Sequence, residues 1–284
     1  MSAALVVGAT GTTGSRVVAG LVAAGVRVRA ASRRAVAVQG SEVDVEAVRF
    51  DWGDPGSYGG VLGGGVDRVY LVPPPGTADP AAVMLPFLRR ARAEGVRRAV
   101  LLSSSAIPSG GPAVGRVHAA LPGIFDEWAV LRPSWFMQNF TGDHLHARTV
   151  RAEGVIRTAA GEGRVGFVDA EDIAAVAVRA LVDERAPNAD LVITGPRALS
   201  YGDVAAVLTE VTGRTVVHQR LTREEMAERL AAEMPAAFAG MLADMDRAIA
   251  GGAEDRTTGT VERVTGRPPH DFRAVAEREA GGRG

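Results

Sequence analysis

The residues GATGTTG at positions 8–14 decide the fold, because they stand between a continuous apolar run and a segment with helical spacing. The run before them, residues 3–7, is too short for a helix and is typical of a strand buried on both faces of a parallel sheet. Residues 15–24 carry apolar side chains at helical spacing, and residues 26–31 read as a second strand. The sequence therefore predicts a strand, a glycine turn, a helix and a second strand.

The same alternation continues along the chain. Further strand-like segments are followed by turns or by helix starts, and they occupy residues 47–50, 66–72, 99–102 and 128–131. Repeated alternation of strands and helices predicts an α/β fold of the Rossmann type, with a doubly wound parallel sheet. We expect this domain to span residues 1–195.

A smaller and mostly helical C-terminal part is expected over residues 196–284, and residues 136–165 are expected to contribute to it. Two capping-box signatures support its helices: Ser200 with Asp203, and Thr222 with Glu225. We assign substrate binding to this part.

Composition excludes several classes of function. The 284 residues carry a net charge of −1, so no charge excess is available to hold nucleic acid or an anionic membrane. All 32 basic residues are arginines, and without lysine the chain has no Schiff base and no lysine-assisted tyrosine acid. The absence of cysteine excludes thiolate nucleophiles and cysteine-ligated metals.

The sequence also gives expectations about location and partners. No run approaches the length of a membrane span, and the N-terminus lacks the basic flank of a signal peptide. We expect a cytoplasmic protein without membrane or nucleic-acid partners, acting on a small molecule. Base rates favour a homodimer, although the sequence singles out no surface for it.

The glycine turn predicts a dinucleotide site. Gly8, Gly11 and Gly14 permit a tight turn and let backbone N–H groups approach a pyrophosphate at the positive end of the helix. We assign cofactor binding to these glycines together with Thr10, Thr12 and Thr13. The alternative is a purely structural turn.

The end of the second strand favours NADP(H) over NAD(H). An acidic residue there would bind the ribose hydroxyls of NAD, but Ser32, Arg33 and Arg34 occupy the position. A guanidinium can grip a 2′-phosphate, although a solvated arginine pair is the alternative. Asp51, at the end of the third strand, is expected near the adenine edge or as a loop cap.

Later strands bring other side chains to the same sheet edge. Val72, Pro73 and Pro74 are expected beside the nicotinamide half of the cofactor, and Ser103 and Pro133 are also assigned to cofactor binding. Ser104 and Ser105 are candidates for orienting a carbonyl or the carboxamide. Capping of the next segment is an equal alternative for the serines.

Several segments together resemble the NmrA-like atypical short-chain dehydrogenase/reductases. They are GATGTTG, the second strand with its Ala-Ala-Ser-Arg end, the three serines, LRPSWFMQNF at 131–140 and FVDAEDIA at 167–174. The LRPSWFMQNF form and LVITGPRALSY at 191–201 are most similar to the ergot-alkaloid reductase-like branch. The resemblance implies a Rossmann domain, NADP(H), and a substrate held between the sheet edge and the C-terminal part.

The catalytic acid departs from the wider superfamily. Short-chain dehydrogenases usually donate a proton through a Tyr-x-x-x-Lys pair, whereas the expected segment here offers Val114 and His118. His118 is the candidate acid, with a helix-surface or core histidine as the alternative. Trp135, Phe136 and Asn139 are assigned to the substrate pocket. His144 and His146 alternate like ligands on a strand, but nothing completes a site, so no metal is assigned.

These features predict an enzyme, an NADPH-dependent reductase of a small, largely apolar imine or iminium, quinone or enone. Reduction of an iminium needs no acid, since the product nitrogen forms neutral, whereas simple ketone reduction would leave an alkoxide without its usual donor. One alternative is a non-catalytic NADP(H)-sensing regulator. A redox-neutral isomerase or cyclase on the same fold is another.

Overall fold

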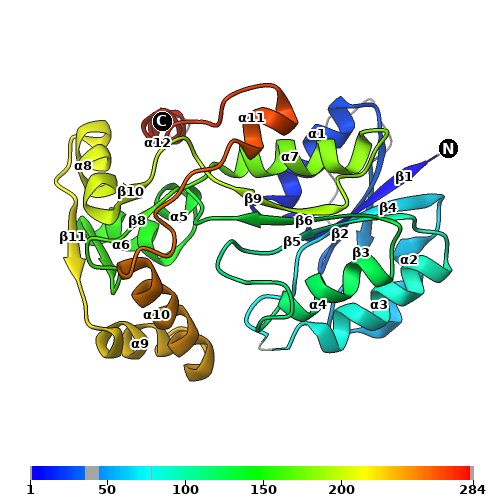
Figure 1. Ribbon diagram of the computed structural model, residues 1–284, viewed down its shortest axis with the longest axis horizontal. Coiled ribbons are helices and arrows are strands. Elements are labelled where there is room, and N and C mark those ends of the chain that lie inside the picture. Colours follow the sequence, from blue (N-terminus) through cyan, green and yellow to red (C-terminus); the bar gives the residue numbers. More distant parts are fainter. Residues whose placement is uncertain (1, 36–44, 78, 282–284) are drawn as a thin grey trace. The chain divides into compact units, whose positions relative to one another are not determined.

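The structure is a computed structural model that describes residues 2–35, 45–77 and 79–281 (Figure 1). Its contacts divide the chain into unit 1, residues 1–132 and 173–192, and unit 2, residues 133–172 and 193–284. The sequence placed the boundary at residue 195 and expected residues 136–165 to contribute to the C-terminal part; by contacts, residues 133–172 group with unit 2. Residues 133–172 join the second unit because their helices and strands pack against segments from the last third of the chain.

Unit 1 contains, among the described residues, a sheet in the order β3-β2-β1-β4-β5-β6-β9. The pairs β1–β2, β2–β3, β1–β4, β4–β5 and β5–β6 are parallel. The strands are β1 Ala3–Val7, β2 Arg27–Ser32, β3 Val45–Arg49, β4 Val66–Leu71, β5 Arg98–Leu102, β6 Glu127–Pro133 and β9 Ala189–Ile193. The order reverses between β1 and β4, which is where open α/β sheets bind ligands at their carboxyl ends. The predicted Rossmann-type fold is confirmed.

Helices cover both faces of this sheet. In Figure 1, α1 and the part of α7 from Ile173 onward lie on one face, and α2, α3 and α4 lie on the other. The helical segments are α1 Gly14–Ala23, the 3-10 turn Pro55–Ser57, α2 Tyr58–Leu62, α3 Ala81–Ala93, α4 Gly115–Ala120, the 3-10 turn Leu121–Gly123 and α7 Ala170–Val182.

The pattern of apolar residues explains this layering. Every residue of β1 is buried, as expected for a strand covered on both faces. Helix α1 buries Val17, Val18 and Leu21 on one side. A Cβ on Gly20 would lie 2.7 Å from Cγ2 of Val178, so the glycine lets α1 and α7 pack closely.

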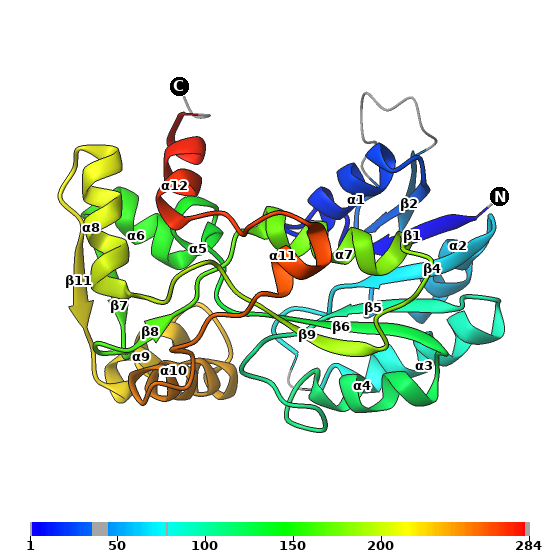
Figure 2. The same cartoon turned by 45° about the horizontal axis from the view of Figure 1, so that its top comes forward.

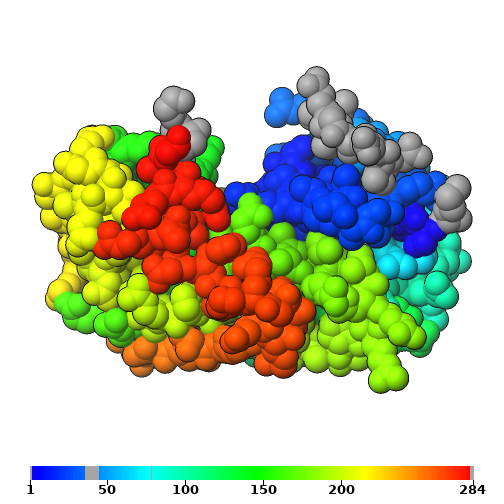
Figure 3. Space-filling model, turned by 90° about the horizontal axis from the view of Figure 1, so that it is seen from above, coloured from blue at the N-terminus to red at the C-terminus, as the bar shows by residue number. Residues whose placement is uncertain are grey.

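Unit 2 is mostly helical, with two small sheets (Figure 2). Strands β7 and β11 pair in parallel, and β8 and β10 pair antiparallel. The elements are α5 Gln138–Thr141, α6 Leu145–Glu153, β7 Val155–Thr158, β8 Arg164–Val165, β10 Leu199–Ser200, α8 Tyr201–Thr212, β11 Val217–Arg220, α9 Arg223–Ala231, α10 Ala236–Ala250, α11 Thr260–Thr265 and α12 Phe272–Gly281. Helix α12, red in Figure 3, lies at the surface and packs on α8.

An aromatic core holds unit 2 together. The ring of Phe140 packs edge-on against Phe167, Tyr201 and Phe272, with centroids 5.3, 6.0 and 5.7 Å away. Burial of such rings is a large stabilising contribution because each removes a wide apolar surface from water. No helix in the described ranges has the length and apolar character needed to cross a membrane.

Local signals in unit 2 had different outcomes. Both capping boxes are present, at the starts of α8 and α9, so these two predictions are confirmed. His144 and His146, which alternate in the sequence like ligands on a strand, lie at the start of a helix. His144 is the N-cap of α6, and its ring nitrogen accepts from the backbone N–H of His146 at 3.2 Å. The two-residue spacing thus belongs to a helix cap.

Candidate functional site

A cavity of about 460 Å³ lies in unit 1 where β1, β2, β3 and β4 end. Its walls come from the last residues of β1 and β2 and from the segments that follow all four strands. They are Val7, Gly8, Thr10, Gly11, Ala31, Ser32, Arg33, Phe50, Asp51, Trp52, Gly53, Val72, Pro73, Pro74, Pro75 and Thr77. The cavity thus brings together nine residues that the sequence assigned to the cofactor.

The glycine turn forms one wall. Gly8 has a φ of +77°, which side-chain-bearing residues rarely adopt. The N-terminus of α1 carries no acidic residue in its first turn and no side-chain cap. Its backbone N–H groups and helix dipole therefore suit an anion, and this end fits the pyrophosphate of a dinucleotide.

The end of β2 contributes Ser32 and Arg33. The Ser32 hydroxyl donates to the carbonyl oxygen of Arg34 at 2.5 Å, which turns the chain sharply after the strand. Arg33 is exposed and lines the cavity, whereas Arg34 is exposed and does not line it. The structure thus separates two neighbouring arginines that the sequence could not distinguish.

The end of β3 contributes Asp51 and a residue that the sequence analysis missed, Trp52. The Asp51 carboxylate accepts from the Gly53 N–H at 2.9 Å, as in the loop-cap alternative. Trp52 is buried, and its indole N–H donates to the carbonyl oxygen of Val72 at 3.0 Å. The sheet-edge argument that selected Asp51 applies equally to the residue after it.

The end of β4 supplies the apolar wall. Val72, Pro73 and Pro74 are half-buried and line the cavity, and Pro75 and Thr77, which were not predicted, extend the wall. Val72 and the three prolines carry no side-chain hydrogen-bond donor. This wall can exclude water from a bound nicotinamide without competing for its polar groups.

Six residues assigned to the cofactor do not line the cavity: Thr12, Thr13, Gly14, Arg34, Ser103 and Pro133. Thr13 is buried, and its hydroxyl accepts from the Tyr70 hydroxyl at 3.0 Å. The carbonyl of Thr12 accepts from Arg16. Gly14 serves close packing of the helix start, and Pro133 belongs to unit 2.

The three serines after β5 have different surroundings. Ser103 donates its N–H to the Leu131 carbonyl, and its buried hydroxyl oxygen has no hydrogen-bond partner in the described part of the chain. The Ser104 hydroxyl accepts from the Ala106 N–H at 3.3 Å, which is the capping alternative. Ser105 is buried, and its carbonyl accepts from Arg132 at 3.0 Å.

His118, on α4, is buried beside an ion pair. Arg132 and Asp190 are 2.6 Å apart, and their opposed charges act on the imidazole. Burial lowers the pKa of His118 below its ordinary value; Asp190 opposes this shift and Arg132 adds to it. The protonated form, which would donate a proton, is therefore less populated at neutral pH than in a free histidine. Within the described residues, its Nδ1 atom has no hydrogen-bond partner.

Comparison with known proteins decides the family. A sequence profile described as NAD(P)H-binding matches residues 8–123. An uncharacterized oxidoreductase, YesF of Bacillus subtilis, is 43% identical over 277 residues, which cover 97% of this chain and 94% of that protein. An agroclavine dehydrogenase of Claviceps fusiformis is 42% identical over 233 residues, covering 78% and 80% of the two chains.

The chain belongs to the NmrA-like atypical short-chain dehydrogenase/reductases. It is an NAD(P)H-dependent oxidoreductase. An NADPH-dependent quinone oxidoreductase of Escherichia coli, solved with NADPH, has the same fold, with a TM-score of 0.79 and 23% identity over 97% of this chain and 99% of that one. The family predicted from the motifs is thus confirmed.

The three residues that the sequence assigned to substrate binding lie in unit 2. Trp135, Phe136 and Asn139 are half-buried. Phe136 forms a parallel bridge with Val168, and the Asn139 N–H donates to the Phe136 carbonyl at 3.1 Å. The neighbouring Gln138 amide donates to Asp169 at 2.8 Å and accepts from the Ala170 N–H at 2.9 Å, so this segment is held firmly.

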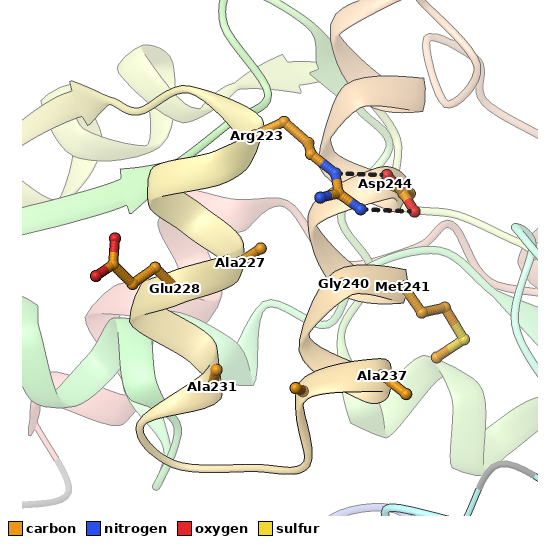
Figure 4. Close-up of a pocket in the computed structure, with 9 residues that line it drawn as sticks. Arg223, Ala227, Glu228, Ala231, Ala237, Gly240, Met241 and Asp244 are labelled. Carbon is orange, nitrogen blue, oxygen red and sulfur yellow. Dashed lines mark hydrogen bonds and ion pairs between the residues drawn. The ribbon is translucent and has the colours of Figure 1, made fainter.

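Another cavity, of about 620 Å³, lies in unit 2 between α9 and α10 (Figure 4). Arg223 reaches from α9 to Asp244 on α10 with two hydrogen bonds, of 2.9 and 3.3 Å. Ala227 points toward α10, whereas Met241 and Glu228 point away from the facing helix. Small side chains and one ion pair therefore border this space.

Proposed function

We propose that this protein is an NADPH-dependent reductase that transfers a hydride to a small, largely apolar imine or iminium, quinone or enone. The position of Arg33 in the wall of the cavity carries the choice of cofactor. A guanidinium binds a phosphate through charge-assisted, bidentate hydrogen bonds, and no carboxylate stands at the end of β2 to bind free ribose hydroxyls. NADPH is therefore favoured over NADH.

The residues of the cavity bind and orient the cofactor. Gly8, Thr10 and Gly11 present backbone to the pyrophosphate, Arg33 holds the 2′-phosphate, and Val72 with the prolines after it keeps water away from the nicotinamide. When bound, NADPH supplies the hydride. The protein's own contribution is then mainly position and the exclusion of water.

The tyrosines support an acceptor that needs no strong acid. The Tyr58 hydroxyl donates to the Trp52 carbonyl and the Tyr70 hydroxyl donates to Thr13. Burial raises the pKa of Tyr58, Tyr70 and Tyr201 above the ordinary value. No lysine is present to lower these values. An iminium acceptor suits this site because hydride addition leaves a neutral nitrogen.

For a quinone or enone, we assign the proton donor to His118, and we assign orientation of the acceptor oxygen to Ser104 and Ser105. The shared contacts of the two serine carbonyls with Arg132 support this grouping. Trp135, Phe136 and Asn139 are proposed to contact the substrate. The similarity to an agroclavine dehydrogenase is consistent with this substrate range.

A titration with NADPH, NADP+, NADH and NAD+ tests the proposal, for the natural protein and for Arg33→Ala. Loss of a charge-assisted contact should weaken NADPH binding by about tenfold to a hundredfold and leave NADH binding unchanged. Arg34→Ala is the matched control, since that side chain does not line the cavity, and it should change neither affinity.

A screen of imines, quinones and enones at saturating NADPH then tests the reaction. Oxidation of NADPH with at least one class supports the reductase, and failure with all three classes would overturn it. Tighter binding of NADP+ than of NADPH would favour the sensor alternative. If Arg33→Ala lost affinity for NADPH and for NADH equally, the assignment of the 2′-phosphate to Arg33 would be overturned.

A further inference from the structure

We propose that Trp52 is a positioning residue for the dinucleotide: its indole N–H fixes the end of β4 and, through Val72, the glycine turn. The inference rests on nucleotide binding in the unit 1 cavity and is independent of the proposed substrate class. It also gives a role to the Asp-Trp-Gly segment after β3, of which the sequence analysis used only the aspartate.

The Trp52 side chain is held by a cluster of rings. Its centroid lies 4.8 Å from Phe50, 5.4 Å from Phe87 and 6.3 Å from Tyr58, each in an edge arrangement. Such packing fixes the orientation of the indole, because aromatic pairs of this geometry are favourable and the site is buried.

The Trp52 backbone is held as well. The Tyr58 hydroxyl donates to the Trp52 carbonyl at 2.8 Å. Burial, with the nearby charges of Asp51 and Asp54, raises the pKa of Tyr58, so the hydroxyl remains a donor at neutral pH. Both the carbonyl and the ring of Trp52 are therefore fixed before any ligand binds.

From this fixed position, Trp52 reaches a segment that its own strand does not contact. Strand β3 is separated from β4 by β2 and β1 in the sheet, yet the indole N–H donates to the Val72 carbonyl just after β4, at 3.0 Å. The Val72 side chain in turn lies against Gly8, where an added Cβ would be 3.1 Å from the Val72 Cβ. Trp52, Val72 and Gly8 thus connect three walls of the cavity.

Trp52→Phe keeps an aromatic ring and removes the N–H. The affinities for NADPH and NADH should both fall by about three- to tenfold, because the glycine turn binds the part that the two cofactors share. The KM for the cofactor should rise by the same factor, with kcat unchanged. This pattern differs from that of Arg33→Ala, which affects NADPH alone, so the two proposals can fail separately.

Calorimetric titration measures both affinities without turnover, and steady-state kinetics separates the KM for the cofactor from kcat. Trp128→Phe is the matched control, because Trp128 lies on β6 and does not line the cavity, and it should change neither affinity. Unchanged affinities in Trp52→Phe, or a loss of affinity for NADPH alone, would each overturn the proposal.

Tyr58→Phe covers the case in which Trp52→Phe does not fold. It leaves the indole in place and removes only the hydroxyl that fixes the Trp52 carbonyl. Thermal unfolding confirms that the variant is folded. Its affinities for both dinucleotides should fall together by about two- to fivefold, and unchanged affinities in a folded Tyr58→Phe would overturn the proposal.

Discussion

The carbonyl oxygen of Gly8 lies where a side chain on Gly14 would have to stand. An ideal Cβ built on Gly14 is 2.1 Å from that oxygen, well inside the 3.0 Å below which Cβ contacts are essentially never seen. Gly8 follows β1 and Gly14 begins α1, so the start of the helix lies directly against the turn. Gly14 therefore permits the close packing of the helix start against the turn, and Gly8 permits the positive φ of the turn.

Gly14→Ala should consequently destabilise the protein and weaken its cofactor site. We expect the free energy of unfolding to fall by about 1–3 kcal/mol, as in other overpacked sites, and the affinity for both dinucleotides to fall with it. Denaturant unfolding and calorimetric titration measure the two effects.

Gly60→Ala is the matched control for Gly14→Ala. Gly60 lies inside α2 and nothing lies within 4 Å of its added Cβ. This change should stabilise the protein by about 0.5–1 kcal/mol, since alanine favours a helix. The prediction is contradicted if Gly14→Ala is as stable as the natural protein and binds both dinucleotides as tightly. The Gly8 turn and α1 could then move apart at little cost.

Much of the cofactor cavity follows from local sequence. A parallel sheet brings the ends of its strands to one edge, so identifying the strands was enough to group Gly8, Arg33, Asp51 and Val72. The capping boxes were also readable, because their hydrogen bonds join residues three apart.

Long-range pairings could not be predicted in this way. The contact of Trp52 with Val72 crosses two intervening strands and has no local signal in the sequence. A contribution of residues 136–165 to the C-terminal part was expected, but the strand pairing of Val155 with Val217 that joins them was not. The burial of Asp246 also has no local signal in the sequence. It depends on the packing of α10 against Ala159, far earlier in the chain.

Asp246 makes the stability of the protein depend on pH. It is buried, its carboxylate accepts from the Ala159 N–H at 2.9 Å, and burial raises its pKa from 3.8 to about 6. Between pH 3.8 and about pH 6, Asp246 is protonated in the folded state and ionised in the unfolded state. The stabilisation is therefore fully present below about pH 4 and is lost as the pH rises through about 6.

Asp246→Asn keeps an acceptor and cannot ionise. Relative to the natural protein, its free energy of unfolding should increase by about 2–3 kcal/mol between pH 4 and pH 7, measured by denaturant unfolding at each pH. Asp244→Asn is the control on the same helix, because Asp244 is exposed and its hydrogen bonds with Arg223 lower its pKa. A difference curve for Asp246→Asn that is flat, or parallel to that of Asp244→Asn, would contradict the prediction.

His118 should matter only for acceptors that need a proton. Burial lowers its pKa, so the acid form is populated mainly at low pH, and the rate with a quinone or enone should fall as the pH rises through that lowered value. His118→Gln should reduce kcat/KM for these acceptors by about tenfold to a hundredfold at low pH and flatten the profile.

An iminium acceptor provides the internal comparison for His118→Gln. It is already cationic, so its reduction should keep the same kcat/KM and the same pH profile in the variant. The pH profile of kcat/KM is measured with one iminium and one quinone on the same preparation. The comparison separates a proton-donating role of His118 from a structural one. Equal losses with both acceptors would make His118 a structural neighbour of the Arg132–Asp190 pair, and no loss with either would remove it from the reaction.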